Sequence, residues 1–233
     1  MSRERHIVAF GGMTEAHAGP LERYVVGLAA RERPRVCFLP TATGDSAERT
    51  LRFYESFRGC ETSHLGLFDR RLADLRGHLL AQDVIQVGGG NTANMLAVWR
   101  VHGVDEILRE AWEAGIVLTG SSAGAICWFE ACVTDSFGDL APLHDGLRFL
   151  AGSMCPHYDS EPGRRPAFQR LVREGFPAGL AAEDDVALHF VGTELAEAVT
   201  SRPGGRAFRV RLLDGHVRET ELAVRLVVPP PPR

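Results

Sequence analysis

The sequence has 233 residues, of which 45% are hydrophobic and 24% charged, and its formal net charge is −4. The proportions are ordinary for a soluble globular protein, and we expect one α/β domain over residues 1–228 and a Pro-rich tail over 229–233. The small negative charge argues against a nucleic-acid partner, and no apolar stretch is long enough to cross a membrane. Irregularly spaced cysteines and no signal peptide predict a cytoplasmic protein, and a homodimer is left open.

The first half of the chain alternates short apolar strands with amphipathic helices. Strands are predicted at residues 6–10, 35–39, 62–67, 84–87 and 116–119, and helices at 21–31, 48–57, 72–80, 93–99 and 104–114. This alternation is typical of an α/β fold with a mostly parallel sheet and helices on both faces.

The second half is less regular. A strand is predicted at residues 153–157, a helix at 166–175, and further strands at 186–191, 196–201, 208–213 and 217–226. The Asp214-Gly215 pair between the last two strands is a strong hairpin signal. We interpret this region as a C-terminal antiparallel β extension of the same domain.

Three glycine-rich turns each follow a predicted strand, at residues 11–12, 88–90 and 120–124. The carboxyl ends of parallel strands meet at one edge of the sheet, where ligands of such folds bind. We therefore expect the three turns to converge on one site.

The segment Gly120-Ser121-Ser122-Ala123-Gly124 fits the pattern G-x-S-x-G. Small residues around the serine allow a sharp turn from strand to helix that leaves the serine oxygen exposed, as a nucleophile requires. A strand precedes the turn and a helix-compatible run, 125–129, follows. Ser122 is the candidate nucleophile, and Ser121 is its neighbour one place too early in the pattern.

A serine nucleophile needs a base, usually histidine, and often a carboxylate that orients the base. Among nine histidines, His157 stands out because Pro156 stiffens the end of the strand before it. His144 and His189 are the alternative candidates for the base.

Four carboxylates lie between Ser122 and His157, and their spacing does not select one: Glu130, Asp135, Asp139 and Asp145. Asp135 is preferred because its β-branched and aromatic neighbours suggest that it is held near a sheet.

The run Gly88-Gly89-Gly90 presents backbone N–H groups that can bind an anion. In a hydrolase this run would form an oxyanion hole with the N–H of Ala123. The alternatives are a structural turn and dinucleotide binding, but the strand and acid that the dinucleotide motif requires are not in place.

The motifs Gly88-Gly89-Gly90-Asn91-Thr92, Ser122-Ala123-Gly124-Ala125 and Pro156-His157-Tyr158, in this order, resemble the peptidase E and cyanophycinase family of serine peptidases. The resemblance covers roughly residues 6–200. It implies a flavodoxin-like sheet, as in the glutamine amidotransferase domain, and hydrolysis through an acyl-enzyme without metal or organic cofactor.

In this resemblance the nucleophile maps to Ser122 and the base to His157. The oxyanion donors map to the backbone at Gly89 or Gly90 and at Ala123. The acid maps best onto Asp135, although this chain is about two residues shorter there than peptidase E. Cyanophycinases use Glu in this role, so Glu130 remains an alternative. Asp139 is also left open.

Peptidase E cleaves dipeptides with an N-terminal aspartate, which implies a small peptide substrate here. Arg164 and Arg165 follow the His157 loop and are the candidates to bind an acidic side chain, because an arginine can bind a carboxylate through two hydrogen bonds. Residues 127–130 depart from the smaller, more polar sequence of aspartyl dipeptidases, which leaves another specificity open. The remaining alternatives are an inactive relative that binds a small anionic metabolite and an amidotransferase-like enzyme, which would need Cys in place of Ser122.

Overall fold

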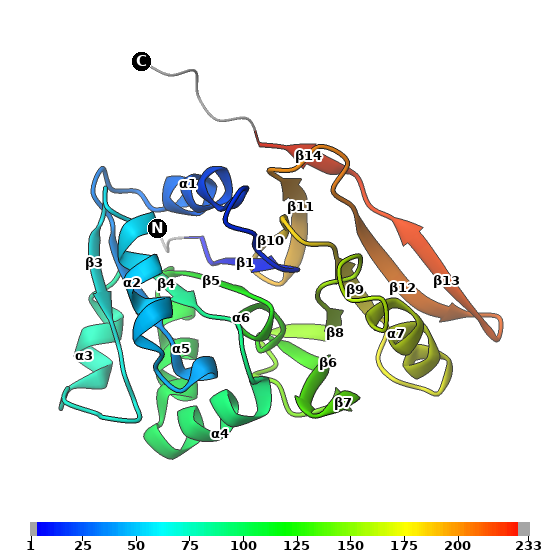
Figure 1. Cartoon of the computed structure of the whole chain (residues 1–233), viewed down its shortest axis with the longest axis horizontal. Helices are drawn as coiled ribbons and strands as arrows, with labels where there is room; N and C mark the ends of the chain where they lie inside the picture. Colours follow the sequence, from blue (N-terminus) through cyan, green and yellow to red (C-terminus); the bar gives the residue numbers. More distant parts are fainter. Residues whose placement is uncertain (1–3, 228–233) are drawn as a thin grey trace.

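The computed structural model describes residues 4–227, which form two β-sheets with helices around them (Figure 1). The predicted tail, 229–233, lies outside the described residues. Within this range no helix is both long and apolar enough to cross a membrane.

The main sheet has eight strands in the order β14-β11-β10-β1-β5-β4-β2-β3. Its strands are β1 (His6–Phe10), β2 (Arg35–Leu39), β3 (Glu61–His64), β4 (Val84–Val87), β5 (Val117–Ser121), β10 (Val186–Val191), β11 (Glu194–Thr200) and β14 (Val224–Leu226). Strands β1 to β5 are mutually parallel, and β10 pairs antiparallel with both β1 and β11. The prediction of a mostly parallel sheet with antiparallel C-terminal strands is confirmed.

Helices cover both faces of this sheet, which explains why its central strands are continuous apolar runs. The helices are α1 (Ala18–Leu28), α2 (Ala47–Ser56), α3 (Leu75–Leu80), α4 (Thr92–His102) and α5 (Val104–Glu113). Because side chains alternate along a strand, Val8 and Phe10 of β1 pack with α1 and α2, whereas Ile7 and Ala9 pack with α3, α4 and α5.

A second, mixed sheet that the sequence did not predict follows the order β13-β12-β9-β8-β6-β7. Its elements are β6 (Phe129–Phe137), β7 (Asp139–Leu143), β8 (Leu150–Cys155), β9 (Gly179–Ala182), β12 (Ala207–Leu213) and β13 (His216–Glu221), with α7 (Arg164–Arg173) packed against it. The expected C-terminal extension is therefore divided between two sheets. The predicted helix 125–129 is also shorter, since α6 (Ala123–Ile126) ends before β6 begins. The single strand expected at 217–226 is β13 and β14, which belong to different sheets.

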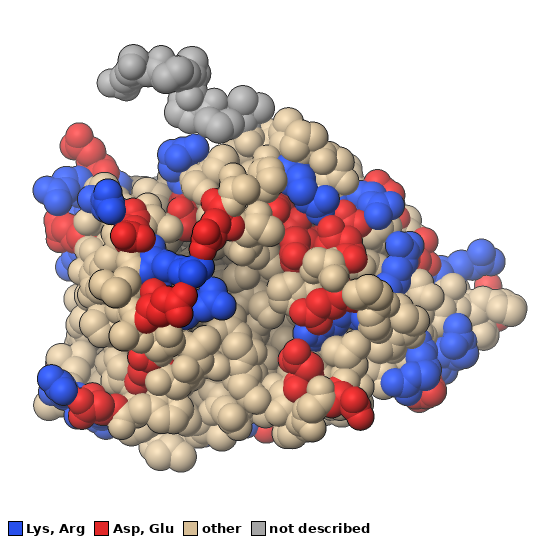
Figure 2. Space-filling model, in the orientation of Figure 1, with Lys and Arg blue, Asp and Glu red and all other residues tan. Residues whose placement is uncertain are grey.

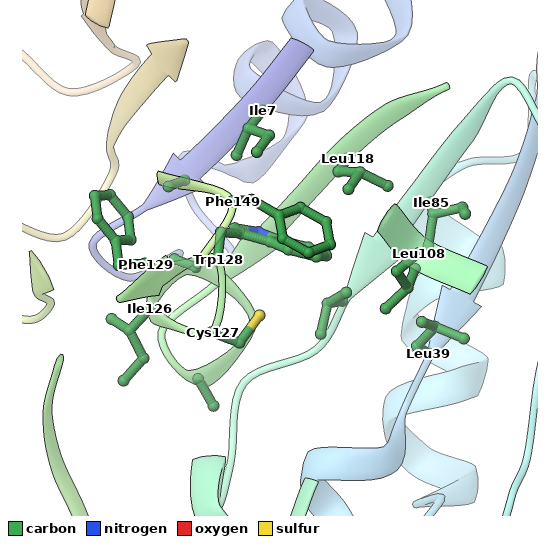
Figure 3. Close-up of a cluster of buried hydrophobic side chains, with 14 of the residues drawn as sticks. Ile7, Leu39, Ile85, Leu108, Leu118, Ile126, Cys127, Trp128, Phe129 and Phe149 are labelled. Carbon is green, nitrogen blue, oxygen red and sulfur yellow. The ribbon is translucent and has the colours of Figure 1, made fainter. Parts of the chain in front are cut away.

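An aromatic cluster packs the segment after Ser122 into the core between the sheets (Figure 3). Trp128 is fully buried, and its ring centroid lies 5.6 Å from that of Phe149 and 6.4 Å from that of Trp99. Burial of this apolar surface stabilises the packing, and it is offset in part because Nε1 of Trp128 is buried without a hydrogen-bond partner in the described residues. This packing anchors the chain directly behind the Ser122 turn.

Candidate active site

Ser122 lies in a strained turn between β5 and α6. Its φ of 53° and ψ of −114° are rarely adopted by a non-glycine residue. The turn closes because Gly120 and Gly124 touch, and a Cβ on Gly120 would lie 2.3 Å from the carbonyl oxygen of Gly124. The glycines of the G-x-S-x-G pattern are thus sterically required, and the strain falls on the serine that they present.

His157 follows β8 and comes from the second sheet to meet Ser122. Its backbone also has a positive φ, 52°, and its N–H donates to the carbonyl of Gly11 over 3.1 Å. The imidazole Nε2 lies 2.9 Å from Oγ of Ser122. The structure therefore brings together the two residues that the sequence singled out, within hydrogen-bond distance.

The carboxylate beside His157 is that of Asp184, in the loop between β9 and β10. Its Oδ1 lies 2.7 Å from Nδ1 of His157, and about a fifth of each side chain is exposed. Burial works to raise the pKa of Asp184, but hydrogen bonds from His157 and Ser160 and the charges of His157 and Arg202 outweigh it and lower that pKa. The lowered pKa favours the ionised carboxylate of Asp184 beside His157.

The backbone of Gly12 lies directly against the hydrogen bond between His157 and Asp184. It forms a parallel bridge with Asp184, and its carbonyl accepts from the N–H of Asp185 over 3.0 Å. A Cβ on Gly12 would lie 1.9 Å from Oδ1 of Asp184 and 2.7 Å from Nδ1 of His157. The first glycine-rich turn therefore serves the base and its carboxylate, where only a hydrogen fits.

The preference for Asp135 beside His157 does not match this geometry. Asp135 lies on β6 with its side chain 55% exposed, and its carboxylate is 3.5 Å from Arg164. The alternatives also lie elsewhere. Glu130 accepts the N–H of Gly152, Asp139 is exposed at the start of β7, and Asp145 pairs with Arg100.

The two alternative histidines, His144 and His189, lie away from Ser122. His144 packs edge-on against Phe176, with centroids 5.1 Å apart. His189 lies on β10 and contacts His6 and Tyr24. Neither is hydrogen-bonded to Ser122, so His157 alone among these three candidates reaches it.

The turn Gly88-Gly89-Gly90 lies beside Ser122, as its place after β4 predicts. A Cβ on Gly89 would be 3.3 Å from Cβ of Ser122. The N–H of Gly88 donates to Leu39, whereas within residues 4–227 no protein acceptor is found for the N–H groups of Gly89, Gly90 and Ala123. Asn91 then caps α4 by accepting from the N–H of Asn94 over 2.9 Å. These N–H groups are therefore candidates to bind an anion near Ser122.

Ser122 and His157 open into a cavity of about 720 Å³ that extends between the carboxyl ends of the strands and the helices α1 and α2. Its lining includes Phe38 and Gln86. The charged residues that line it are Arg49, Arg52, Glu15, Glu22 and Glu55. Figure 2 shows basic and acidic side chains next to one another over α2, at the edge of a hollow in the surface. Arg52 pairs with Glu48 and Glu15, whereas no ion pair of Arg49 is found within residues 4–227.

Arg164 and Arg165, the arginines expected to reach the substrate, do not line this cavity. Arg164 is 2% exposed and donates to the carbonyl of Val133 and to Glu161, so it ties α7 to β6. Arg165 pairs with Glu219 and lies over the ring of Tyr158. Both side chains hold the second sheet together.

Asp184 is not among the four carboxylates predicted from the sequence, because it lies after His157 in the chain and not between Ser122 and His157. One signal was available: the acidic run Glu183-Asp184-Asp185 directly precedes the strand predicted at 186–191. Because β10 pairs antiparallel with β1, the residues before β10 come to the Gly11-Gly12 turn.

Together, Ser122, His157 and Asp184 form a hydrogen-bonded chain beside free backbone N–H groups. Such a chain allows histidine to take the serine proton while the carboxylate holds the imidazole in the required tautomer. The distances between these three side chains are those that nucleophilic catalysis by a serine requires.

Comparison with known proteins gives the family. The model of peptidase family S51 matches residues 7–198, so the chain belongs to this peptidase family, the family of peptidase E. The chain is 47% identical over 227 residues to the Bacillus subtilis (strain 168) protein named "Uncharacterized peptidase YgaJ", covering 95% of this chain and 98% of that protein. It is 26% identical over 151 residues to "Uncharacterized peptidase Lmo0363" of Listeria monocytogenes, covering 60% and 72%.

Two solved structures share the fold at 18% sequence identity. A peptidase from an acI-B1 Actinobacterium superposes with a TM-score of 0.69 and covers 96% of each chain. A putative peptidase E protein from Listeria monocytogenes EGD-e superposes with a TM-score of 0.57, covering 94% of this chain and all of that one. The fold of this chain is therefore that of known peptidases.

Proposed function

We propose that the protein is a serine peptidase of the peptidase E type, with Ser122 as nucleophile, His157 as base and Asp184 as the acid that orients His157. The observation that carries this proposal is the hydrogen-bonded chain, 2.9 Å from Ser122 to His157 and 2.7 Å from His157 to Asp184. Both distances lie within the range expected of a nucleophile, its base and the orienting group.

The reaction proceeds through an acyl-enzyme. Oγ of Ser122 attacks the peptide carbonyl while Nε2 of His157 takes its proton, and the oxyanion is stabilised by the N–H groups of Gly89 or Gly90 and Ala123. His157 then protonates the leaving amine. Water, activated by the same base, hydrolyses the ester and restores Ser122.

The substrate is a short peptide or dipeptide, and one with an acidic N-terminal residue fits best. The cavity that begins at Ser122 and His157 is lined by charges of both signs: Arg49 and Arg52, and Glu15, Glu22 and Glu55. Arg52 is paired with Glu15 and Glu48, whereas Arg49 has no ion-pair partner within residues 4–227 and is the lining cation left to bind a substrate carboxylate. A guanidinium that faces a cavity can bind a carboxylate through charge-assisted hydrogen bonds. We therefore assign to Arg49 the carboxylate-binding role that the sequence suggested for Arg164 and Arg165.

A dipeptide-library screen tests this function. Asp-X and Glu-X dipeptides are compared with neutral N-termini, using the wild type and Ser122→Ala. Ser122→Ala is expected to lose a factor on the order of 10⁴ or more in turnover of the best dipeptide. Cleavage that survives this substitution would reject Ser122 as the nucleophile.

A further inference from the structure

A ring of hydrogen bonds includes the backbone N–H and the backbone carbonyl of Asp184. The N–H of Asp184 donates to Oδ1 of Asp159 over 2.9 Å. Nη2 of Arg202 donates to Oδ2 of Asp159 over 2.8 Å and to the carbonyl oxygen of Asp184 over 3.1 Å. The ring therefore closes on the backbone of the residue that contacts His157.

We propose that Arg202 and Asp159 are positioning residues, which set the distance between Asp184 and His157 by clamping the backbone of Asp184. The proposal rests on the proposed function, in which Asp184 orients the base. Neither residue touches the reacting atoms. They act through the location of the Asp184 carboxylate.

The elements that carry the ring explain why it can set this distance. Asp159 lies two residues after His157, so its carboxylate links the loop of the base to the loop of the acid. Arg202 follows β11, where Oγ1 of Thr200 accepts the N–H of Arg202 and donates to the carbonyl of Asp185. The clamp therefore joins the loops after β8, β9 and β11 at one point.

The positive charge of Arg202 also stabilises this region, because several carboxylates lie around it. Three carboxylates lie around the Arg202 guanidinium, those of Asp159, Glu183 and Asp184. Without a cation between them, their mutual repulsion would destabilise this arrangement of the loops. Nη2 of Arg202 lies 2.8 Å from Asp159 and 3.4 Å from Glu183, so one cation faces two of these groups and the backbone of the third. A cation at this distance from partly buried carboxylates interacts more strongly than one in bulk water.

Arg206 provides a matched control. Its guanidinium also pairs with Glu183, with Nη2 2.7 Å from Oε1, and no hydrogen bond from it to Asp159 or Asp184 is found within residues 4–227. Replacing Arg206 removes the same charge beside the same carboxylate but leaves the ring intact.

The test measures how fast diisopropyl fluorophosphate inactivates the protein. In this reaction Oγ of Ser122 bonds to phosphorus, the P–F bond breaks, fluoride leaves and His157 takes the serine proton. The probe needs no knowledge of the peptide substrate. Its maximal inactivation rate, kinact, reports the geometry of the reacting groups, and KI reports binding of the probe.

Arg202→Gln and Asp159→Asn should each lower kinact about tenfold to hundredfold and leave KI within about twofold, because small displacements of reacting groups cost this much. Arg206→Gln should stay within about twofold of wild type. The Arg202/Asp159 double variant should lose no more than the slower single variant, since both changes open the same ring. If a variant with Gln at 202 does not fold by circular dichroism, Arg202→Lys is compared with Arg206→Lys instead.

Equal kinact for the Arg202 and Arg206 variants, or additive losses in the double variant, would overturn the clamp while Ser122 remains reactive. Failure of the proposed function looks different: the folded wild-type protein would not react with the probe at all, or Ser122→Ala would react equally fast.

Discussion

Gly12 lies so close to Asp184 that no side chain fits between them, since a Cβ on Gly12 would be 1.9 Å from Oδ1 of that carboxylate. The contact places the backbone of the β1 turn directly against the hydrogen bond between Asp184 and His157. Three chain segments, from β1, β8 and the loop before β10, thus meet at one hydrogen bond.

Gly12→Ala should therefore abolish most activity by displacing Asp184 or His157. We expect kcat/KM to fall about a hundredfold, the cost of a misplacement of about 1 Å. The control is Gly27→Ala on α1, where an added Cβ has no neighbour within 4 Å. Activity of Gly12→Ala equal to that of the control would show that the contact does not position the pair.

Substituting Asp184 and Asp135 in turn identifies the carboxylate that orients His157, because the two substitutions should have different effects. Asp184→Asn should lower kcat by roughly 10⁴-fold, as loss of the orienting carboxylate does in serine proteases, because the imidazole is then held in the wrong tautomer. Asp135→Asn should leave kcat within about twofold, since Asp135 is half-exposed and pairs with Arg164. If steady-state kinetics instead showed the larger loss for Asp135→Asn, Asp135 would be the carboxylate that orients His157.

Arg49 should govern the preference for acidic peptides. Arg49→Gln is expected to raise KM for an Asp-X dipeptide by about tenfold and to leave a neutral dipeptide almost unchanged, because a charge-assisted hydrogen bond is lost. Arg165→Gln is the matched control, since its guanidinium pairs with Glu219 away from the cavity. An equal rise in KM for both dipeptides would argue against this role.

A histidine network away from the site makes stability depend on pH. Nε2 of His189 lies 3.0 Å from Nδ1 of His6, and Nδ1 of His189 lies 2.5 Å from the hydroxyl of Tyr24, which donates to Glu197. Burial lowers the pKa of His189 and of His6; the proximity of His6 lowers that of His189 further, against the opposing charges of Glu197 and Glu4.

A folded-state pKa below the unfolded value means that the unfolded chain binds the proton more tightly. The contribution of this network to the free energy of unfolding is fully present above the unfolded pKa of about 6.5, and it decreases as the pH falls below that value. We expect Tm to fall between about pH 7 and pH 5, and less so in His189→Gln, which cannot be protonated. His216→Gln, at an exposed position on β13, should follow the wild type. A His189→Gln profile as steep as that of the wild type would exclude the network as the cause.

Local patterns predicted the part of the molecule in which each strand is followed by its own helix. The turns at Gly12, Gly89 and Ser122 follow parallel strands, so their meeting follows from the strand order. The second sheet could not be predicted in this way, because no strand was expected where β6, β7 and β9 lie, and the pairs β6–β8 and β8–β9 depend on those strands. Asp184 was not predicted because it follows His157 in the chain, and only the pairing of β10 with β1 brings it to the Gly12 turn.

The arginines show a different limit of sequence reasoning. Arg164 is close to His157 in the chain, yet its side chain is buried against Val133, on the side of α7 that packs on the second sheet. Arg49 is far from Ser122 in the chain and lines the same cavity. Distance along the chain says little about which charge reaches a cavity between two layers.

The central claim is that Ser122 is a nucleophile activated by His157, and the most direct measurement is the site of covalent labelling by a fluorophosphonate. We predict one label per chain, mapped to Ser122 by peptide mass spectrometry, retained in Ser121→Ala and absent in Ser122→Ala. A folded wild-type protein that takes up no label, as expected for a relative that only binds an anion, or a label that persists in Ser122→Ala, would contradict the account.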